Sequence, residues 1–416
     1  MSRSLLTLIA ALSLIAPMAY GAQAPVNLPD GEGKPLVQGL CATCHQLNLL
    51  PRSSGYTREG WKEHVATMIN LSGTPQEEII IQYLATHFPP NTNLAPTLVP
   101  GPVTIKFKEW KVPQLGQRAR DPVQAPDGSI WYCGQFGNVV GRIDPKTGEV
   151  REYTLPDKAL PHSVTPDREG NIWYTGNGNG TVGKLDPKTG MITEYKMPDP
   201  AAKDPHTAEF DAKGRLFFTL QVSNMIGRLI PSTGEIKLVT VARKNSRPYG
   251  IKVARDGSLW VSCNGSNCLL NVDPETLAIK QFELPEGTTV RRLDLAADGM
   301  IWYVNSGLGR LGRMDPKSGQ FKEWNSPSGP KSHPYAIAVV DGKVWYNEST
   351  QRPDALVMFD PSSEKFQSWP IPSGNIYGGI LRHMRPTKDG NLLIHQTSTN
   401  RIYEVDVKSG ARRVAN

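Results

Sequence analysis

Two cysteines and a histidine near the N-terminus have the spacing of a covalent haem site. Cys41, Cys44 and His45 form the motif C-x-x-C-H. Two thiols at this spacing can add to the two vinyl groups of haem, and the adjacent imidazole can ligate the iron. A zinc site built from such pairs needs a second pair, and the sequence contains no second C-x-x-C. The motif therefore predicts one covalently attached haem c.

The sixth iron ligand is expected to follow the motif. Trp61, His64, Val65 and Met68 are spaced i, i+3, i+4 and i+7. This spacing places them on one helical face. Met68 is the only methionine between the motif and residue 100, so we expect its thioether to pair with His45 on the iron. The alternatives are that Met68 only packs in the core, or that the iron is open or ligated by a second histidine.

A capped helix is predicted further along. Thr74, with Pro75 after it and Glu77 three residues on, forms a capping box with proline at the first helical position. The apolar residues that follow predict a helix that ends before Pro89. A haem motif followed by amphipathic helices resembles a small class I cytochrome c domain. We expect this all-α domain at residues 25–90 and a proline-rich linker at 91–102.

The first 21 residues have the pattern of a secretory signal peptide. Arg3 is followed by an apolar run from Leu5 to Met18 and by small residues around Ala22. The run is shorter than the ~20 residues that a membrane-spanning helix needs. We therefore expect residues 1–21 to be removed, which leaves no integral membrane segment. The mature protein is predicted to be periplasmic, where c-type haem is attached.

Composition narrows the class of partner. The 416-residue chain is 38% hydrophobic and 20% charged, which excludes a disordered or a membrane-embedded chain. Its formal net charge of +7 is spread widely, without a run of lysine and arginine. Nucleic-acid binding is therefore not expected. We expect a monomer that meets a redox partner protein or a small-molecule substrate.

The rest of the sequence repeats one unit. A turn glycine followed by an aromatic-rich strand recurs at steps of 42 to 48 residues. The landmark residues are Trp131, Trp173, Phe217, Trp260, Trp302, Trp345 and Leu393. Strand-length apolar runs between Gly, Asp and Pro turns at this period predict one four-stranded blade per repeat. We therefore expect a seven-bladed β-propeller at residues 103–416. The segment from Phe107 to Pro113 resembles a fourth strand and should close the ring by joining the last blade.

The blade pattern also indicates which side chains meet at one end of the central channel. Each first strand begins at the end of the channel where the second strand finishes. The predicted first-strand starts are Arg120, His162, His206, Tyr249, Arg291, Tyr335 (with His333 nearby) and Arg382 or His383. The predicted second-strand ends are Gly134, Gly176, Leu220, Cys263, Asn305, Glu348 and Gln396. Such polar and aromatic residues around one opening indicate a ligand site, although strand ends that simply face water are the alternative.

Two further cysteines flank a short hairpin turn. Cys263 and Cys268 are separated by Asn-Gly-Ser-Asn, which would place the two sulfurs across the turn. Because export permits oxidation, we expect a disulfide between them. Cys133 is then left as a buried thiol near a strand end.

The repeat text resembles the virginiamycin B (streptogramin) lyase family of seven-bladed propellers. The segments 161–164, 181–186 and 193–195 carry the resemblance best. It covers about three quarters of the chain and implies the fold. Lyases of this family open a cyclic ester by elimination. They use a magnesium ion, a histidine in a Pro-His motif and two carboxylates, one of which lies two residues before the histidine and the other at the end of the next strand.

That residue set is divided among blades in this sequence. His206 has Asp204 two residues before it, but Leu220 stands at the strand end. His162 lacks both carboxylates. Blade 6 has Glu348 at the strand end, with Tyr335 where the histidine belongs. The candidates for a catalytic role are therefore His206, Asp204, Glu348, His162 and Tyr335. Magnesium is expected only if the chemistry is lyase-like.

The sequence thus predicts an exported c-type haem protein for periplasmic electron transfer, with substrate or partner binding at the propeller mouth. A haem-dependent oxidoreductase would fit this description. One alternative is a lyase or lactone-opening enzyme of the carbon–oxygen class with an accessory cytochrome. Another is a non-catalytic propeller that docks a redox partner.

Overall fold

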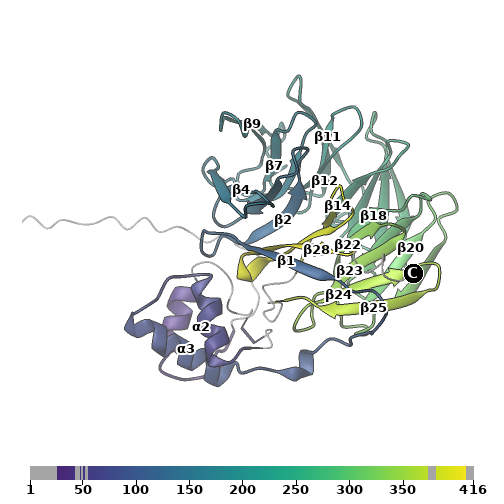
Figure 1. Cartoon of the computed structure of the whole chain (residues 1–416). Helices are drawn as coiled ribbons and strands as arrows, with labels where there is room; N and C mark the ends of the chain where they lie inside the picture. The colour runs from purple at the N-terminus through teal and green to yellow at the C-terminus, as the bar shows by residue number, and fades with distance from the viewer. Residues whose placement is uncertain (1–25, 43–46, 48–49, 52–54, 373–380, 409–416) are drawn as a thin grey trace, which may run out of the picture.

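The computed structural model describes residues 26–42, 47, 50–51, 55–372 and 381–408 (Figure 1). The predicted signal peptide and three residues of the C-x-x-C-H motif, Thr43, Cys44 and His45, lie outside the described residues. Helices occur only before residue 95 in this part of the chain, apart from one short 3-10 turn, η5 (Thr397–Thr399). Everything from residue 106 onward is built from strands and turns.

The described strands form seven four-stranded antiparallel sheets, which confirms the predicted seven-bladed propeller. Blade 1 contains β2 (Ala119–Gln124), β3 (Ile130–Gly134), β4 (Val139–Ile143) and β5 (Val150–Thr154). Blade 2 contains β6 (Pro161–Pro166), β7 (Ile172–Gly176), β8 (Thr181–Leu185) and β9 (Ile192–Lys196). Blade 3 contains β10 (Pro205–Phe210), β11 (Leu216–Leu220), β12 (Met225–Ile230) and β13 (Glu235–Thr240). Blade 4 contains β14 (Pro248–Val253), β15 (Leu259–Cys263), β16 (Cys268–Val272) and β17 (Ile279–Glu283).

The remaining blades continue the same order. Blade 5 contains β18 (Val290–Leu295), β19 (Ile301–Asn305), β20 (Arg310–Met314) and β21 (Phe321–Asn325). Blade 6 contains β22 (Pro334–Val340), β23 (Lys343–Glu348), β24 (Ala355–Asp360) and β25 (Lys365–Pro370). Blade 7 contains β26 (Arg385–Pro386), β27 (Leu392–Gln396), β28 (Arg401–Asp406) and β1 (Lys106–Lys111). The second strands end at the residues that the sequence predicted.

The ring is closed by β1, as the sequence predicted. This strand pairs antiparallel with β28 over its whole length, with Trp110 opposite Ile402. The Trp110 ring packs in a buried cluster with Tyr132 of blade 1 and Leu393 of blade 7. An N-terminal strand therefore joins the first and last blades in one core, and Figure 1 shows β1 beside β28.

A glycine recurs in the third strand of several blades, as at Gly141, Gly183 and Gly312, and it has a packing reason. Gly141 in β4 lies under the ring of Tyr132 in β3, and a Cβ at that glycine would lie 2.1 Å from the ring. The Tyr132 hydroxyl reaches past it and donates to Glu152 of β5 at 2.7 Å. Tyr303 and Glu323 form the same pair in blade 5, at 3.0 Å. Glycine in the third strand thus lets the second-strand tyrosine hydrogen-bond to the fourth-strand glutamate.

The N-terminal region contains α1 (Lys34–Leu36), the π-helical turn η1 (Val37–Cys41), α2 (Arg58–Ala66), α3 (Pro75–His87) and the 3-10 turn η3 (Thr92–Leu94). The predicted capping box is present, because the Thr74 hydroxyl accepts from the Glu77 amide. Trp61, His64 and Val65 are buried on α2. In contrast to the expected shared helical face, Met68 lies in the turn after α2 ends at Ala66 and is half-buried. None of the described helices is long and apolar enough to span a bilayer.

The helical region contacts the propeller at the end where the first strands begin. The Thr67 carbonyl accepts from the Gly116 amide at 2.9 Å and from the Asn400 side chain at 3.0 Å. Arg352 of blade 6 donates its amide to the Leu94 carbonyl at 2.6 Å. The predicted linker lies against the same blade, since Val99 donates to the Ser368 hydroxyl at 2.8 Å.

Candidate functional site

Irregular first strands position the side chains at the channel end. In six of the seven first strands the pairing register shifts at two adjacent residues just after the strand begins. These pairs are Asp121–Pro122, His162–Ser163, His206–Thr207, Tyr249–Gly250, Arg291–Arg292 and Tyr335–Ala336. A β-bulge breaks the strict alternation of a strand and re-aims its side chains. Neighbouring residues such as Arg291 and Arg292 therefore both reach the channel.

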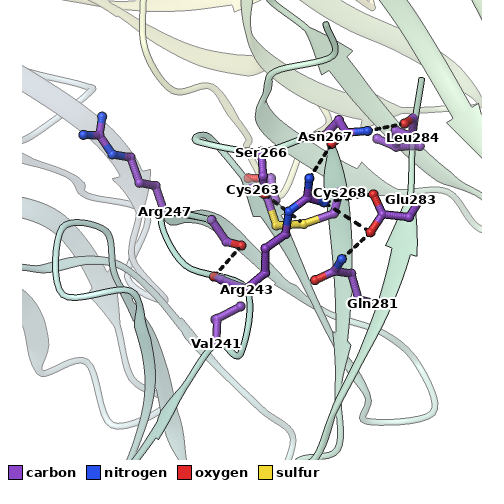
Figure 2. The surroundings of a disulfide bond; sticks show 12 residues. Val241, Arg243, Arg247, Cys263, Ser266, Asn267, Cys268, Gln281, Glu283 and Leu284 are labelled. Carbon is purple, nitrogen blue, oxygen red and sulfur yellow. Dashed lines mark hydrogen bonds and ion pairs between the residues drawn. A yellow bond between two sulfur atoms is a disulfide. The ribbon is translucent and has the colours of Figure 1, made fainter. Parts of the chain in front are cut away.

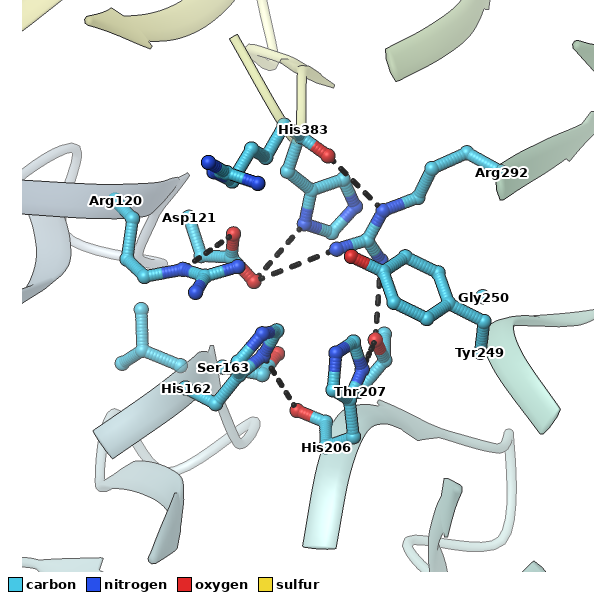
Figure 3. Close-up of polar contacts among 12 residues, drawn as sticks. Arg120, Asp121, His162, Ser163, His206, Thr207, Tyr249, Gly250, Arg292 and His383 are labelled. Atoms are coloured by element: carbon cyan, nitrogen blue, oxygen red, sulfur yellow. Dashed lines mark hydrogen bonds and ion pairs between the residues drawn. The ribbon is translucent and has the colours of Figure 1, made fainter. Parts of the chain in front are cut away.

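The result is a set of converging side chains that we call the central cluster. It consists of Arg120, Asp121, His162, His206, Tyr249, Arg291, Arg292, Tyr335, Arg382 and His383. Figure 3 shows most of these side chains pointing toward one another from strands on all sides of the channel. All are buried except Arg291 and Arg382, which are half-buried. Six of the ten are first-strand residues that the sequence predicted to meet here, and Arg382 and His383 are the two options that it gave for blade 7.

Aromatic rings form a continuous row through the cluster. The ring centroids of His162 and His206 are 3.5 Å apart, and those of His206 and Tyr249 are 4.2 Å apart. The hydroxyl oxygens of Tyr249 and Tyr335 lie 2.5 Å apart across the channel. Arg291 stacks over the Tyr335 ring at 5.1 Å. The row brings two imidazoles and two phenols within reach of one another.

One carboxylate faces several cationic groups. Asp121 is fully buried, and its oxygens lie 3.6 Å from Arg120 Nε, 3.8 Å from Arg292 Nη2 and 3.3 Å from His383 Nδ1. Burial raises the pKa of Asp121, but His383, Arg120 and Arg292 lower it by more, to well below the usual value. Asp121 also has a positive φ of 51°, a region that few non-glycine residues adopt. A charged, conformationally unusual residue therefore stands at the centre of the site.

The buried histidines of the cluster are neutral near pH 7. Burial is the main cause that lowers the pKa of His162, His206 and His383 well below the usual value, and nearby arginines lower it further. A neutral imidazole can accept a proton or a hydrogen bond, but a lowered pKa makes it a weak base. The positive charge of the cluster therefore comes from its arginines.

The lyase-like candidates do not join the cluster as a set. Asp204 accepts from the amide and the hydroxyl of Ser223 and so caps the turn between β11 and β12. Glu348 is buried inside blade 6, where it accepts from Ser326 and from the Ser328 amide. Neither carboxylate has a hydrogen bond or an ion pair with His206 in the described part of the chain. Among the described residues no group of three or more His, Cys, Asp and Glu is placed to hold a metal ion.

The haem-motif residues lie in a separate region. Cys41 ends the turn η1 and packs against the buried apolar cluster that contains Trp61, Val65 and Leu84. The other thiol and the imidazole of the motif lie outside the described residues. Met68, the expected sixth ligand, follows α2, and its carbonyl oxygen approaches Gly116 of the propeller. In donor chemistry, two thiols, an imidazole and a thioether suit a c-type haem, and of these donors the structure describes Cys41 and Met68.

A disulfide closes the turn between β15 and β16. The structure joins Cys263 and Cys268, whose Cα atoms are 5.5 Å apart, and Figure 2 shows the bridge beside Ser266 and Arg243. The Arg243 guanidinium binds the Glu283 carboxylate at 2.9 Å. Cys133 is buried in β3, and burial raises the pKa of its thiol well above the usual value. It is therefore a thiol rather than a thiolate.

Several functional side chains were missed by the sequence reasoning. Asp121 and Arg292 follow predicted positions directly, and a strict alternation would have turned them away from the channel. Arg385 and His395 are also buried, and His395 Nε2 accepts from the Arg382 and His383 amides at 3.2 Å. The available signal was the pairing of polar residues in an otherwise apolar strand, as in Arg120-Asp121 and Arg291-Arg292.

Comparisons with known proteins agree with the propeller. A virginiamycin B lyase from Staphylococcus aureus is 23% identical over 73% of this chain and 99% of its own, with a TM-score of 0.65. A streptogramin B lyase structure is 22% identical over 73% of this chain and 98% of its own, with a TM-score of 0.66. The WD40 propeller domain of Doa1 is 13% identical over 74% and 99%, with a TM-score of 0.59. At these identities the likeness shows the fold.

No curated protein sequence matches the chain. The profile of the virginiamycin B lyase family matches residues 102–267 and 235–414, which include all seven blades. These matches begin after the helical region. The chain belongs to the virginiamycin B lyase family.

Proposed function

We propose that this protein is an exported c-type haem protein that carries out periplasmic electron transfer. Its propeller binds a small-molecule substrate or a redox partner at the central cluster. The observation that carries the proposal is the C-x-x-C-H donor set, whose first cysteine packs against the apolar cluster of the helical region. The haem would supply one-electron redox chemistry.

The residues of the chain have separate roles in this proposal. Cys41 and Cys44 would tether the haem, and His45 and Met68 would ligate its iron. The buried face formed by Trp61, Val65 and Leu84 would exclude water from one side of the macrocycle. Low solvent access and a thioether ligand both raise the reduction potential of a haem.

The contact between the two regions supports a shared function. Gly116 and Asn400 hold the turn that contains Thr67 and Met68 at the same end of the propeller as the central cluster. Burial raises the pKa of Tyr56 in the helical region, and the charges of Arg352 and Arg401 of the propeller oppose this rise. An electron carrier and a ligand site on one face could act on the same molecule.

The test is the visible spectrum of the purified full-length protein, with and without reductant. The proposal predicts reversible reduction with the absorption bands of a c-type haem. Met68→Ala should lower the reduction potential, because the axial thioether raises it. Met191→Ala is the matched control, since Met191 is 69% exposed on the propeller, and it should leave the potential unchanged. A protein without haem bands would refute the proposal, and an unchanged potential in Met68→Ala would remove Met68 as a ligand.

Family membership favours a second candidate, a lyase that opens a lactone or cyclic ester with the cytochrome as an accessory. His206 is the residue best placed for it, because its ring lies in the central cluster and is neutral. Turnover of a cyclic ester, with magnesium added, should then fall strongly in His206→Ala. His87→Ala, in the helical region, is the control. Turnover that is undetectable, or equal in both variants, would count against this candidate.

A further inference from the structure

The central cluster carries more positive than negative charge. Arg120, Arg291, Arg292 and Arg382 face the channel, with Asp121 as the one carboxylate among the cluster residues. Arg385, on β26, is a further buried guanidinium, but it donates to the Val164 carbonyl and is balanced by the Glu209 carboxylate. The neighbouring histidines are neutral because of burial. Buried charges are retained in proteins when a partner of opposite charge completes them.

Each deep arginine is fixed by some of its donors and leaves others unused. Arg292 donates Nε to the Arg382 carbonyl and Nη1 to the Thr207 hydroxyl, both at 3.1 Å. Its Nη2 has no hydrogen bond within the described chain, and it lies 3.8 Å from Asp121. Arg120 donates Nη1 to Gln135 at 3.0 Å, while its Nε and Nη2 have no hydrogen bond in the same set of residues. Both side chains are only 2% exposed.

The position of Asp121 also leaves guanidinium donors unused. Neither oxygen of Asp121 accepts a hydrogen bond from Arg120 or Arg292, and the nitrogen nearest to it is His383 Nδ1 at 3.3 Å. Its distances to the two guanidinium groups exceed those of direct charge-assisted hydrogen bonds. Asp121 therefore balances the arginines without using up their donors. Those donors are available for an oxyanion.

We propose that the central cluster binds a small oxyanion, a carboxylate- or phosphate-bearing molecule held by Arg120 and Arg292. The planar guanidinium offers paired N–H donors that match both groups. The rings of His206 and Tyr249 form one wall, which favours an aromatic body on the anion. The inference rests on the part of the proposed function that places ligand binding at the propeller mouth, and it does not depend on the haem.

The experiment is isothermal titration calorimetry of the full-length protein at low salt. The probes are benzoate, citrate and inorganic phosphate, which separate an aromatic carboxylate, a polycarboxylate and a phosphate. At least one should bind with an affinity that falls as chloride is added. Failure of all three to bind would overturn the proposal.

Arginine variants test whether the probe anion binds at the central cluster. Arg292→Gln should weaken the bound probe roughly tenfold or more, because one fixed guanidinium is lost. Arg292→Lys should recover only part of the affinity, since lysine keeps the charge without the fork. Arg243→Gln on the outer surface is the control and should bind as the parent protein does. If Arg292→Gln does not fold, Arg120→Gln takes its place. Unchanged binding in a folded variant of either arginine would also overturn the proposal.

Haem attachment and anion binding can be tested independently of each other. The double variant Cys41→Ala, Cys44→Ala cannot attach haem by thioethers but keeps the propeller, so it should bind the probe as the parent does. Loss of haem bands with intact anion binding would affect only the proposed redox function. Haem bands without anion binding would affect only this inference.

Discussion

At the scale of single residues, Tyr335 shows how the cluster tunes a side chain. Burial raises its pKa, but Arg291, Arg382 and the hydrogen bond from Tyr249 lower it by more, to about 7. Arg120 adds to this lowering, and the His333 ring lies 5.8 Å away. Tyr249 keeps its proton, because burial and Tyr335 raise its pKa to about 12. Tyr335 is thus the phenol that ionises, and Tyr249 donates to it.

We expect one tyrosine to ionise near neutral pH, seen as ultraviolet absorbance of a phenolate. Tyr335→Phe should abolish this step. Tyr83→Phe is the control, because burial raises the pKa of Tyr83 and keeps it protonated there. A spectrum with no phenolate step near neutrality in the parent protein would contradict the assignment.

Ionisation of Tyr335 should make both the stability of the fold and the affinity for the proposed anion depend on pH. The folded pKa lies below the value of 10.0 for a free tyrosine, so this group contributes stability that is fully present above pH 10 and is lost as pH falls through about 7. Anion affinity should change in the opposite sense. The phenolate adds a negative charge to the central cluster, so the proposed anion should bind more weakly above the pKa of Tyr335 than below it. Calorimetry about one pH unit either side would detect this, and Tyr335→Phe should remove the difference.

At the scale of elements, α3 depends on its first residue. The Thr74 hydroxyl accepts from the Glu77 amide at 3.3 Å, while the Glu77 carboxylate accepts from the Gly73 amide at 3.3 Å. Thr74→Ala removes the first bond and should cost about 1 kcal/mol of stability in the helical region. Thr86→Ala, at an exposed position within the same helix, should cost little, because the hydrogen bond it loses from Gln82 is exposed to solvent and alanine is the better helix former. Thermal unfolding followed by circular dichroism compares the two, and equal effects would contradict the capping role.

The elements also show where sequence reasoning ends. Strand positions, the closing strand and the capping box could be predicted because each depends on local patterns: turn glycines, a repeated text and a Thr-Pro-x-Glu box. The bulges could not, since they arise where each first strand meets its neighbours in the ring. A strict alternation places Arg291 in the channel but turns Arg292 away, and the bulge brings both inward. The position of Met68 beyond α2 was missed for a similar reason, since its turn is held by Gly116 of the propeller.

At the scale of the whole molecule, one asparagine links the two regions. Asn138 and Asn400 both adopt positive φ in the turn before the third strand of their blades. The Asn138 amide donates within its own blade, to the Leu155 and Pro156 carbonyls. The Asn400 amide instead donates to Thr67 of the helical region at 3.0 Å and to Gln114 at 3.2 Å. The same turn therefore serves as an attachment point in blade 7.

This difference predicts the behaviour of matched variants. Asn400→Ala should loosen the helical region, because it removes a bond worth about 1 kcal/mol. Hydrogen exchange of amides near the end of α2 should then be roughly fivefold faster. Asn138→Ala changes an equivalent turn and should leave those amides protected. Equal exchange in both variants would show that Asn400 does not hold the helical region.

The most direct test of the central claim is the intact mass of the mature full-length protein, purified from a host that matures c-type cytochromes. We expect the mass of the chain without residues 1–21 plus one haem, retained after denaturation because thioether bonds hold it. Cys41→Ala, Cys44→Ala should show the chain alone. A parent protein whose mass is that of the bare polypeptide would contradict the account.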